Sequence, residues 1–325
     1  MGAADGWGVD RAASAWSGRD DGPGRAHARW HSVVRPGSGA EPGDAVVIGF
    51  ASDEGVRRNK GRVGAADGPQ ALREALASLA APGVGVVDAG DVVVDADLEG
   101  GQDRLGSVVA EVLRAGAVPV VLGGGHAVAF GSYLGWAELA SGVGGPASEP
   151  DAGRAPARWG VLNIDAHFDL RDDPVPSSGT PFLQAARAEA AAGREFRYAV
   201  VGISRANNTR ALFDTADSLG VAHLDDDACE PSAVRQFVAD FLEVVDRVHL
   251  TIDLDAMPAS VAPGVSAPAG FGISVDAVRA AVTTVVRAGK LGVLEVAELN
   301  PRFDIDARTA RTAARCVDEV VRHLA

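Results

Sequence analysis

Cysteine is scarce in this sequence of 325 residues, which contains only Cys229 and Cys316. Two thiols so far apart in the chain do not make a disulfide scaffold, and they exclude a zinc site built from thiolates. We therefore expect two ordinary buried thiols and a reducing, cytoplasmic environment.

Long apolar segments are missing as well. No stretch approaches the roughly 18 apolar residues of a membrane-spanning helix, so the sequence predicts no membrane span. The first residues, MGAADGWGVDRAASAW, have neither a basic start nor an apolar run, and they give no support for a secretory signal.

Positive charge is in deficit, because 30 Lys and Arg residues face 44 Asp and Glu residues, a formal net charge of −14 at pH 7. This surplus of negative charge repels phosphate backbones and anionic lipids. The composition is otherwise that of a globular protein, with 47% hydrophobic and 23% charged residues. We expect a small-molecule substrate and neither a nucleic-acid nor a membrane partner.

Short runs rich in Val, Ile and Leu alternate with Ala-rich stretches along most of the chain. The expected strands are 45–50, 84–90, 118–125, 159–165, 198–204, 221–224, 248–255 and 291–298. The expected helices are 69–80, 104–115, 182–192, 231–245, 274–288 and 308–324. Several runs are apolar throughout, which is typical of strands buried on both faces. The pattern predicts an α/β protein with a mostly parallel sheet of about eight strands covered by helices on both faces.

Two segments do not fit the alternation. Residues 1–44 carry Gly, Pro and charge without a clear period, and we expect an irregular N-terminal arm that packs on the core. Residues 141–158 are rich in Gly, Pro and Ala and should form a surface loop rather than a domain boundary. The chain is therefore predicted to be a single domain, 1–325.

Ligand-type residues gather where three of the runs end. In open parallel sheets, ligands bind beyond the carboxyl ends of the strands. In VLNIDAHFD and LTIDLD the spacing of every second residue should place side chains on one side of an extended chain. The six candidate metal ligands are His126, Asp165, His167, Asp169, Asp253 and Asp255.

Four carboxylates and two imidazoles on one rim would repel one another without a counter-charge. Two divalent cations would balance the four negative charges. Oxygen and imidazole ligands favour Mn²⁺, while Zn²⁺, Co²⁺ and Fe²⁺ are compatible with the same ligand types. Two ions roughly 3.5–4 Å apart would acidify a shared water molecule to hydroxide at neutral pH. The predicted chemistry is metal-assisted hydrolysis.

A phosphate-binding loop is the alternative interpretation of the GGGH segment, but its signatures are absent. The sequence has no GxxxxGK[ST], and Val128 stands where GxGxxG needs its third glycine.

The same segments resemble those of a known superfamily. GGGH (123–126), DAHFD (165–169), DLD (253–255) and ELNP (298–301) are similar to blocks of the arginase/agmatinase ureohydrolases, and more closely to their formimidoylglutamase branch. Longer and more specific blocks extend the resemblance from residue 16 to residue 311: WSGRDD (16–21), DEGVRRNKGRVGAADGP (53–69), GISRANNT (202–209), DLDAMPASVAPGVSAPA (253–269) and AELNPRFDIDARTAR (297–311).

The resemblance implies a three-layer α/β/α fold and a site with two Mn²⁺ ions held by the six candidate ligands. It implies hydrolysis of N-formimidoyl-L-glutamate to L-glutamate and formamide in histidine degradation, and a homo-oligomer. Asp169 would also carry a proton to the leaving nitrogen, and Glu298 would pair with the cationic amidine group, which a bidentate carboxylate contact suits. Two alternatives remain open: another ureohydrolase that releases urea from a guanidino acid, and a metal-binding protein without turnover.

Two departures from the arginase pattern bear on the substrate. Ser178 stands where guanidino-hydrolysing members usually carry His before Gly-Thr, and Pro258-Ala259 replaces a common Asp-Pro. A substrate with two carboxylates needs cations near the acidic rim, and guanidinium groups suit carboxylates well. A basic run at Arg57, Arg58 and Arg62 either serves the same end or faces solvent. The candidate substrate contacts are Arg171, Arg205, Asn207, Ser178 and Thr180.

Overall fold

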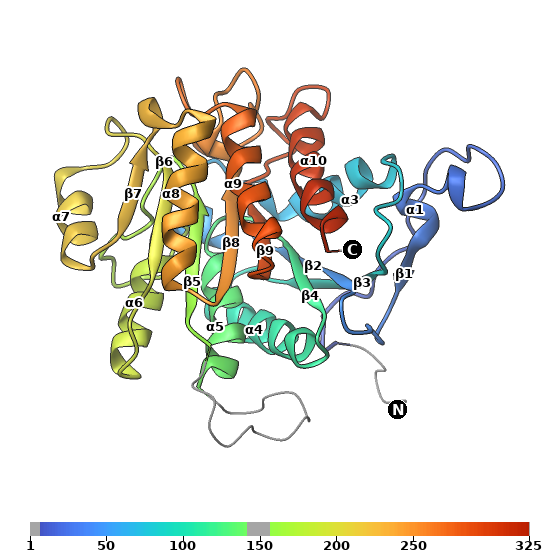
Figure 1. Ribbon diagram of the computed structural model, residues 1–325, viewed down its shortest axis with the longest axis horizontal. Coiled ribbons are helices and arrows are strands. Elements are labelled where there is room, and N and C mark those ends of the chain that lie inside the picture. Colours follow the sequence, from blue (N-terminus) through green and yellow to red (C-terminus); the bar gives the residue numbers. More distant parts are fainter. Residues whose placement is uncertain (1–6, 142–156, 325) are drawn as a thin grey trace.

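The computed structural model describes residues 7–141 and 157–324 (Figure 1). One parallel sheet of nine strands forms its middle layer, in the order β1-β3-β2-β4-β9-β8-β5-β6-β7. The strands are β1 (Val34–Pro36), β2 (Ala45–Ala51), β3 (Val86–Val93), β4 (Val118–Leu122), β5 (Trp159–Ile164), β6 (Tyr198–Ile203), β7 (Ala222–Asp225), β8 (Arg247–Asp253) and β9 (Leu291–Ala297).

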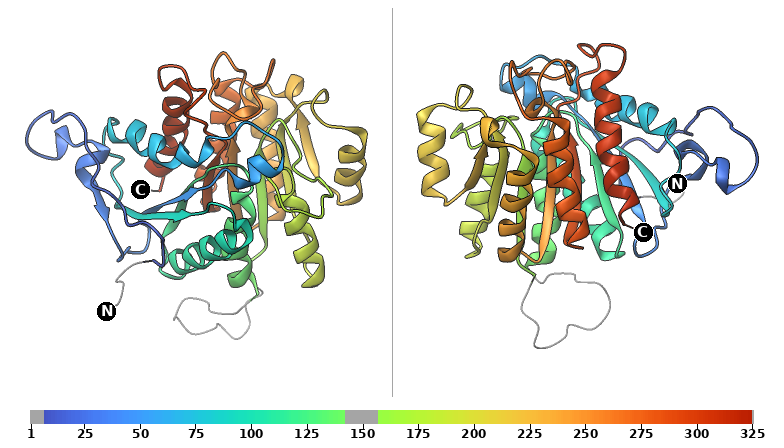
Figure 2. Two further views of the ribbon diagram at one scale, coloured as in Figure 1. Left: turned by 180° about the vertical axis from the view of Figure 1, so that it is seen from behind. Right: turned by 45° about the horizontal axis from the view of Figure 1, so that its top comes forward.

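Helices cover both faces of this sheet (Figure 2). One face carries α3 (Gly68–Ala77), α8 (Pro231–Val244), α9 (Val275–Arg287) and α10 (Arg308–Arg322). The other carries α4 (Leu98–Arg114), α5 (Val128–Ala140), α6 (Pro181–Ala191) and α7 (Arg210–Ser218). The shorter helices are α1 (Trp30–Val33) and α2 (Glu54–Arg58), and the 3₁₀ turns are η1 (Arg25–His27), η2 (Ala65–Asp67), η3 (Asp226–Ala228) and η4 (Leu254–Ala256).

Strand β2 shows how the sequence produces the two cores. Its residues are buried throughout, yet alternate side chains point to opposite faces. Ala45 and Val47 join the apolar cluster under α3, α8, α9 and α10, whereas Val46, Ile48 and Phe50 join the cluster under α4, α5 and α6. The predicted three-layer α/β/α architecture is confirmed.

All eight expected strands are present, and the ninth, β1, comes from the segment expected to be an irregular arm. This segment also contains η1 and α1, and β1 pairs in parallel with β3. Helices α1, α2, α5 and α7 lie outside the expected helix ranges. Of the expected surface loop 141–158, residues 142–156 lie outside the described part of the chain.

Strand β9 has a special place in the sheet. The strands that precede it form two blocks, β1 to β4 and β5 to β8, and β9 lies between β4 and β8. The four central strands β4, β9, β8 and β5 are neighbours, and the segments that follow them meet at one edge of the sheet.

Candidate metal centre and its cavity

The glycine turn after β4 positions His126. A Cβ on Gly124 would lie 1.8 Å from the carbonyl oxygen of Ser52, so this position requires glycine. The Gly125 N–H donates to the same carbonyl, at 3.0 Å. The chain can therefore pass close to the end of β2 and turn the His126 ring into the space above β8 and β5.

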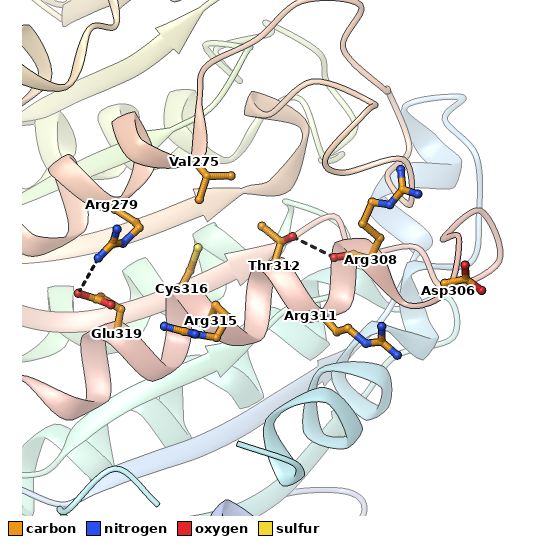
Figure 3. A pocket seen from close by; sticks show the side chains of 9 residues that line it. All are labelled: Val275, Arg279, Asp306, Arg308, Arg311, Thr312, Arg315, Cys316 and Glu319. Carbon is orange, nitrogen blue, oxygen red and sulfur yellow. Dashed lines mark hydrogen bonds and ion pairs between the residues drawn. The ribbon is translucent and has the colours of Figure 1, made fainter. Parts of the chain in front are cut away.

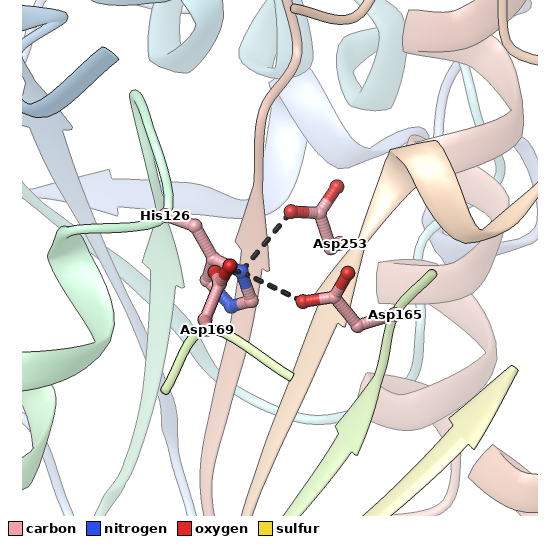
Figure 4. Close-up of side chains that lie close together, drawn as sticks. All are labelled: His126, Asp165, Asp169 and Asp253. Carbon is pink, nitrogen blue, oxygen red and sulfur yellow. Dashed lines mark ion pairs between the residues drawn. The ribbon is translucent and has the colours of Figure 1, made fainter. Parts of the chain in front are cut away.

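One group of ligand atoms surrounds His126 (Figure 4). Its Nδ1 atom lies 3.1 Å from Asp165 Oδ2, 3.0 Å from Asp169 Oδ2 and 3.0 Å from Asp253 Oδ2. Asp253 is the last residue of β8, and the other three residues come from the segments that follow β4 and β5. Asp169 is the member most open to solvent, with 12% of its side chain exposed.

A second group of ligand atoms adjoins the first. His167 Nδ1 lies 3.4 Å from Asp165 Oδ1 and 3.3 Å from Asp255 Oδ2. Asp165 thus gives one carboxylate oxygen to each group. The structure brings all six predicted ligands together in two adjoining centres.

The backbone differs from the extended chain that the alternating spacing predicted. The Asp165 carboxylate accepts a hydrogen bond from the His167 N–H at 2.7 Å, and the Asp253 carboxylate accepts one from the Asp255 N–H at 2.8 Å. Such Asx turns fold the chain locally, and Asp255 lies in the 3₁₀ turn η4. Asp169, at φ 50°, occupies the left-handed region. The expectation of an extended chain was wrong, because short-range carboxylate bonds bend both segments.

The donor set fits divalent cations. Donors about 2.1 Å from a common ion and at right angles around it lie about 3 Å apart, which is the spacing around His126. His126 Nδ1 and one oxygen each of Asp255 and Glu298 are buried without a hydrogen-bond partner among the described residues. Burial and neighbouring carboxylates raise the pKa of Asp169 to about 6 and that of Asp253 well above its usual range. Cations would neutralise this repulsion.

A buried chain of hydrogen bonds orients the ring of His126. Its Nε2 lies 3.0 Å from Thr251 Oγ1, and the Thr251 hydroxyl donates to Glu295 at 3.0 Å. Since that hydroxyl proton is committed to Glu295, Nε2 of His126 must carry the proton that Thr251 accepts. The Nδ1 lone pair is then left facing the carboxylates, as a metal ligand requires. Sequence reasoning missed Thr251 and Glu295, although polar residues inside apolar strands were a usable signal.

Glu298 follows β9 directly and also lines the site. Its φ of 68° turns the chain so that Oε1 accepts a hydrogen bond from the His126 N–H at 2.8 Å. Burial and the charge of Asp255 raise the pKa of Glu298 to about 8. A planar cation beside it would favour the charged carboxylate.

The ligand atoms line a cavity of 330 Å³. Its wall consists of Asn59, Lys60, Gly61, Arg62, His126, His167, Asp169, Arg171, Ser178, Leu212, Asp253, Asp255, Ser266, Ala267 and Glu298. Of the predicted substrate contacts, Arg171 and Ser178 are therefore on the wall. Lys60 and Asn59 were missed, because a basic run gives no indication of which member faces inward.

The other predicted substrate contacts lie elsewhere. Arg205 pairs with Asp225 at 2.5 Å, and Asn207 is exposed to solvent. The Thr180 hydroxyl is buried and donates to the carbonyl of Ser177 at 3.1 Å. The neighbouring Asn208 has the structural role instead, because its buried amide binds the backbone of Ala166 and Phe168 within the ligand loop.

The basic run is mostly committed to the protein itself. Arg57 and Arg58 pair with Glu54. Arg62 donates to the carbonyls of Val265 and Ser266, and its guanidinium lies 4.0 Å from the ring centroid of Phe303. These three cations are used by the fold.

A larger cavity of 490 Å³ lies between α9 and α10, away from the carboxylates (Figure 3). Arg279, Arg308, Arg311 and Arg315 line it, and Arg279 faces Glu319 at 3.8 Å. It contains none of the predicted site residues, so the chemistry belongs to the smaller, acidic cavity. Buried Cys316 lies at its floor, and Cys229 is buried as well, as expected.

Comparison with known proteins places the chain in a family. The model of the family described as "Arginase family" matches residues 43–322. A formimidoylglutamase of Nocardia farcinica is 56% identical over 319 residues, which cover 97% of this chain and 98% of the relative. One from Chromobacterium violaceum is 48% identical over 317 residues, covering 95% and 97%.

A solved structure agrees with these relatives. The crystal structure of Trypanosoma cruzi formiminoglutamase with Mn²⁺ superimposes with a TM-score of 0.75 at 26% identity, over 86% of this chain and 93% of that one. No helix in the described ranges is long and apolar enough to cross a membrane. With its nine-stranded parallel sheet, its two adjoining ligand groups and these relatives, the chain belongs to the arginase family.

Proposed function

We propose that the protein hydrolyses N-formimidoyl-L-glutamate to L-glutamate and formamide, using two Mn²⁺ ions per subunit, in histidine degradation. The observation that carries the proposal is the pair of ligand groups sharing Asp165 at the floor of an acidic cavity. Two relatives that match nearly the whole chain are formimidoylglutamases, and the matching solved structure contains Mn²⁺.

The six ligand residues divide between two ions in this proposal. His126, Asp165, Asp169 and Asp253 would hold one ion, and Asp165, His167 and Asp255 would hold the other. Divalent cations supply Lewis-acid activation of water at such a site.

Asp169 has the position of a proton carrier. Water adds to the amidine carbon, the bond from that carbon to the glutamate nitrogen breaks, and the leaving nitrogen must gain a proton. The Asp169 carboxylate is the one of the first group most open to the cavity, with 12% of its side chain exposed. It can accept the proton released by water and deliver it to the leaving amine.

Glu298 complements the positive charge of the substrate. An amidinium group is planar and cationic, and a carboxylate binds such a group through two parallel hydrogen bonds. Glu298 lines the cavity, and its Oε2 has no partner among the described residues. Ser178, whose Oγ accepts a hydrogen bond from the Asn59 amide at 3.1 Å, completes this part of the wall but carries no titratable proton at neutral pH.

A product assay tests the proposal. The Mn²⁺-loaded protein is offered N-formimidoyl-L-glutamate, guanidino acids and agmatine, and formamide and urea are measured separately. We expect formamide and glutamate from the first substrate and no urea from the others. Asp253→Asn serves as the control for a contaminating activity. Urea as the main product would favour the guanidino-acid alternative, and an absence of turnover would favour a metal-binding protein without catalysis.

We also propose a single catalytic domain, 1–325, that acts in the cytoplasm as a homo-oligomer. The described part of the N-terminal segment is held to the sheet by Trp16, which donates to Asp88 at 2.7 Å, and by Arg11, which pairs with Asp91 at 2.6 Å. Phe271 is 88% exposed. Aromatic residues are enriched at subunit interfaces, and in an isolated subunit such residues are exposed to solvent. Light scattering of wild type and Phe271→Ser measures the assembly state; a monomeric wild type contradicts this part of the proposal.

A further inference from the structure

We propose that Lys60 is a specificity-determining residue that binds one carboxylate of the substrate while Arg171 binds the other. This inference rests on the function proposed above. At the end of α2 the fold places a lysine in a backbone conformation suited to glycine.

Helix α2 ends in a Schellman motif. The Gly61 N–H donates to the carbonyl of Val56 at 2.9 Å, and the Lys60 N–H donates to the carbonyl of Arg57 at 3.0 Å. In this motif the residue at the position of Lys60 adopts the left-handed conformation and is usually glycine. Lys60 has a φ of 62°, so a residue with a side chain is kept here in a strained backbone conformation. Backbone strain of this kind clusters at positions whose side chains contribute to a binding or catalytic site.

Lys60 lines the cavity together with the metal-ligand residues. Three cationic side chains of Lys or Arg are on this wall. Arg62 is already bound to the carbonyls of Val265 and Ser266. The side-chain nitrogens of Lys60 and Arg171 have no hydrogen bond or ion pair with any residue in the described ranges.

The backbone of Arg171 is fixed by a hydrogen bond, whereas its guanidinium group has no partner among the described residues. Its backbone N–H donates to the carbonyl of Gly179 at 2.9 Å. A Cβ on Gly179 would lie 2.7 Å from Cδ of Arg171, so the absence of a side chain there makes room for the arginine stem. The wall thus presents two unengaged cations from separate segments of the chain.

The number of unengaged cations on the wall equals the number of carboxylates in the substrate. N-formimidoyl-L-glutamate carries an α-carboxylate and a γ-carboxylate on one side of the scissile bond. The acids of the cavity repel both groups, whereas one ammonium and one guanidinium can each bind one of them. The cations therefore select a dicarboxylic amidine over agmatine, whose tail is cationic.

Steady-state kinetics on three substrates test the inference: N-formimidoyl-L-glutamate, N-formimidoylglycine without the γ-carboxylate, and N-formimidoyl-γ-aminobutyrate without the α-carboxylate. We expect Lys60→Gly to raise KM about tenfold on the dicarboxylate with little change in kcat, as for a contact equal in ground and transition states. On one of the two monocarboxylates the same variant should change KM little, because the partner carboxylate is absent. Lys60→Arg should restore most of the affinity.

The fold provides a matched control. Ala307 is also in the left-handed region, at φ 51°, and does not line the acidic cavity. Ala307→Gly and Lys60→Gly should each keep or raise the melting temperature, since glycine relieves strain, but only Lys60→Gly should change KM. A wild type that releases no formamide overturns the proposed function and this inference with it. Wild-type turnover with an unchanged KM in Lys60→Gly overturns the inference alone.

Discussion

Replacing Thr251 by Val tests the link between the buried hydrogen-bond chain and metal binding. Valine keeps the shape of threonine and removes only the hydroxyl, which lies 3.0 Å from both His126 Nε2 and Glu295 Oε1. The change leaves a buried N–H and a buried carboxylate oxygen without their partner. Each such group costs about 1–3 kcal/mol of stability.

The larger effect should be on metal affinity. Without the acceptor at Thr251, nothing keeps the proton on Nε2 of His126, and loss of an orienting partner of this kind typically weakens metal binding about 10- to 100-fold. Mn²⁺ affinity is measured by competition with a chelating dye, and the number of bound ions by elemental analysis. Thr251→Ser, which keeps the hydroxyl, is the control and should retain most of the affinity. Binding of two ions by Thr251→Val with wild-type affinity would refute the proposed orientation of His126.

Three further experiments address the site. Removing metal with a chelator should lower the melting temperature and added Mn²⁺ should restore it, because the cations offset the repulsion among the buried carboxylates; an unchanged melting temperature would contradict this. In the metal-free protein, burial raises the pKa of Asp169 from 3.8 to about 6 and that of Glu298 from 4.5 to about 8, so the folded state binds more protons than the unfolded state and stability should fall as the pH rises from 4 to 8. Thermal unfolding measured across that pH range checks the direction of this change. A melting temperature that rises with pH would contradict the prediction and show that other titratable groups dominate the pH dependence. Arg171→Ala should raise KM for formimidoylglutamate about 10- to 150-fold, and an unchanged KM would remove Arg171 from the binding wall.

Much of the fold follows from apolar periodicity, and the exceptions have physical causes. Seven of the eight expected strands were recognisable because they are buried along nearly their whole length, whereas β7, at the sheet edge, is exposed or half-buried. Helix α5 has no clear amphipathic period, because it is apolar around most of its surface: it packs against the sheet, α4 and α6, and Gly135 allows close approach to Val109 of α4. Strand β1 has only three residues, too few for a visible alternation.

The site shows a similar division. The metal-ligand positions could be predicted because short segments after central strands must meet at one sheet edge. The residues that contact the substrate could not be predicted, because this depends on which Lys and Arg side chains form ion pairs or hydrogen bonds within the protein. Arg205 is paired with Asp225, which the alignment of β6 with β7 brings close. Lys60, in the same basic run as Arg57 and Arg58, remains unengaged because its backbone turns away from α2.

The position of β9 has a consequence for the order of events during synthesis. This strand is translated last among the nine, yet it joins the two blocks of the sheet, and Glu298 directly behind it binds the backbone of His126, 172 residues earlier. A nascent chain lacking β9 presents two open edges, at β4 and β8, which can pair with other chains. The catalytic pocket therefore cannot mature until residues 291–298 have left the ribosome, and chaperone protection should matter most before this segment emerges.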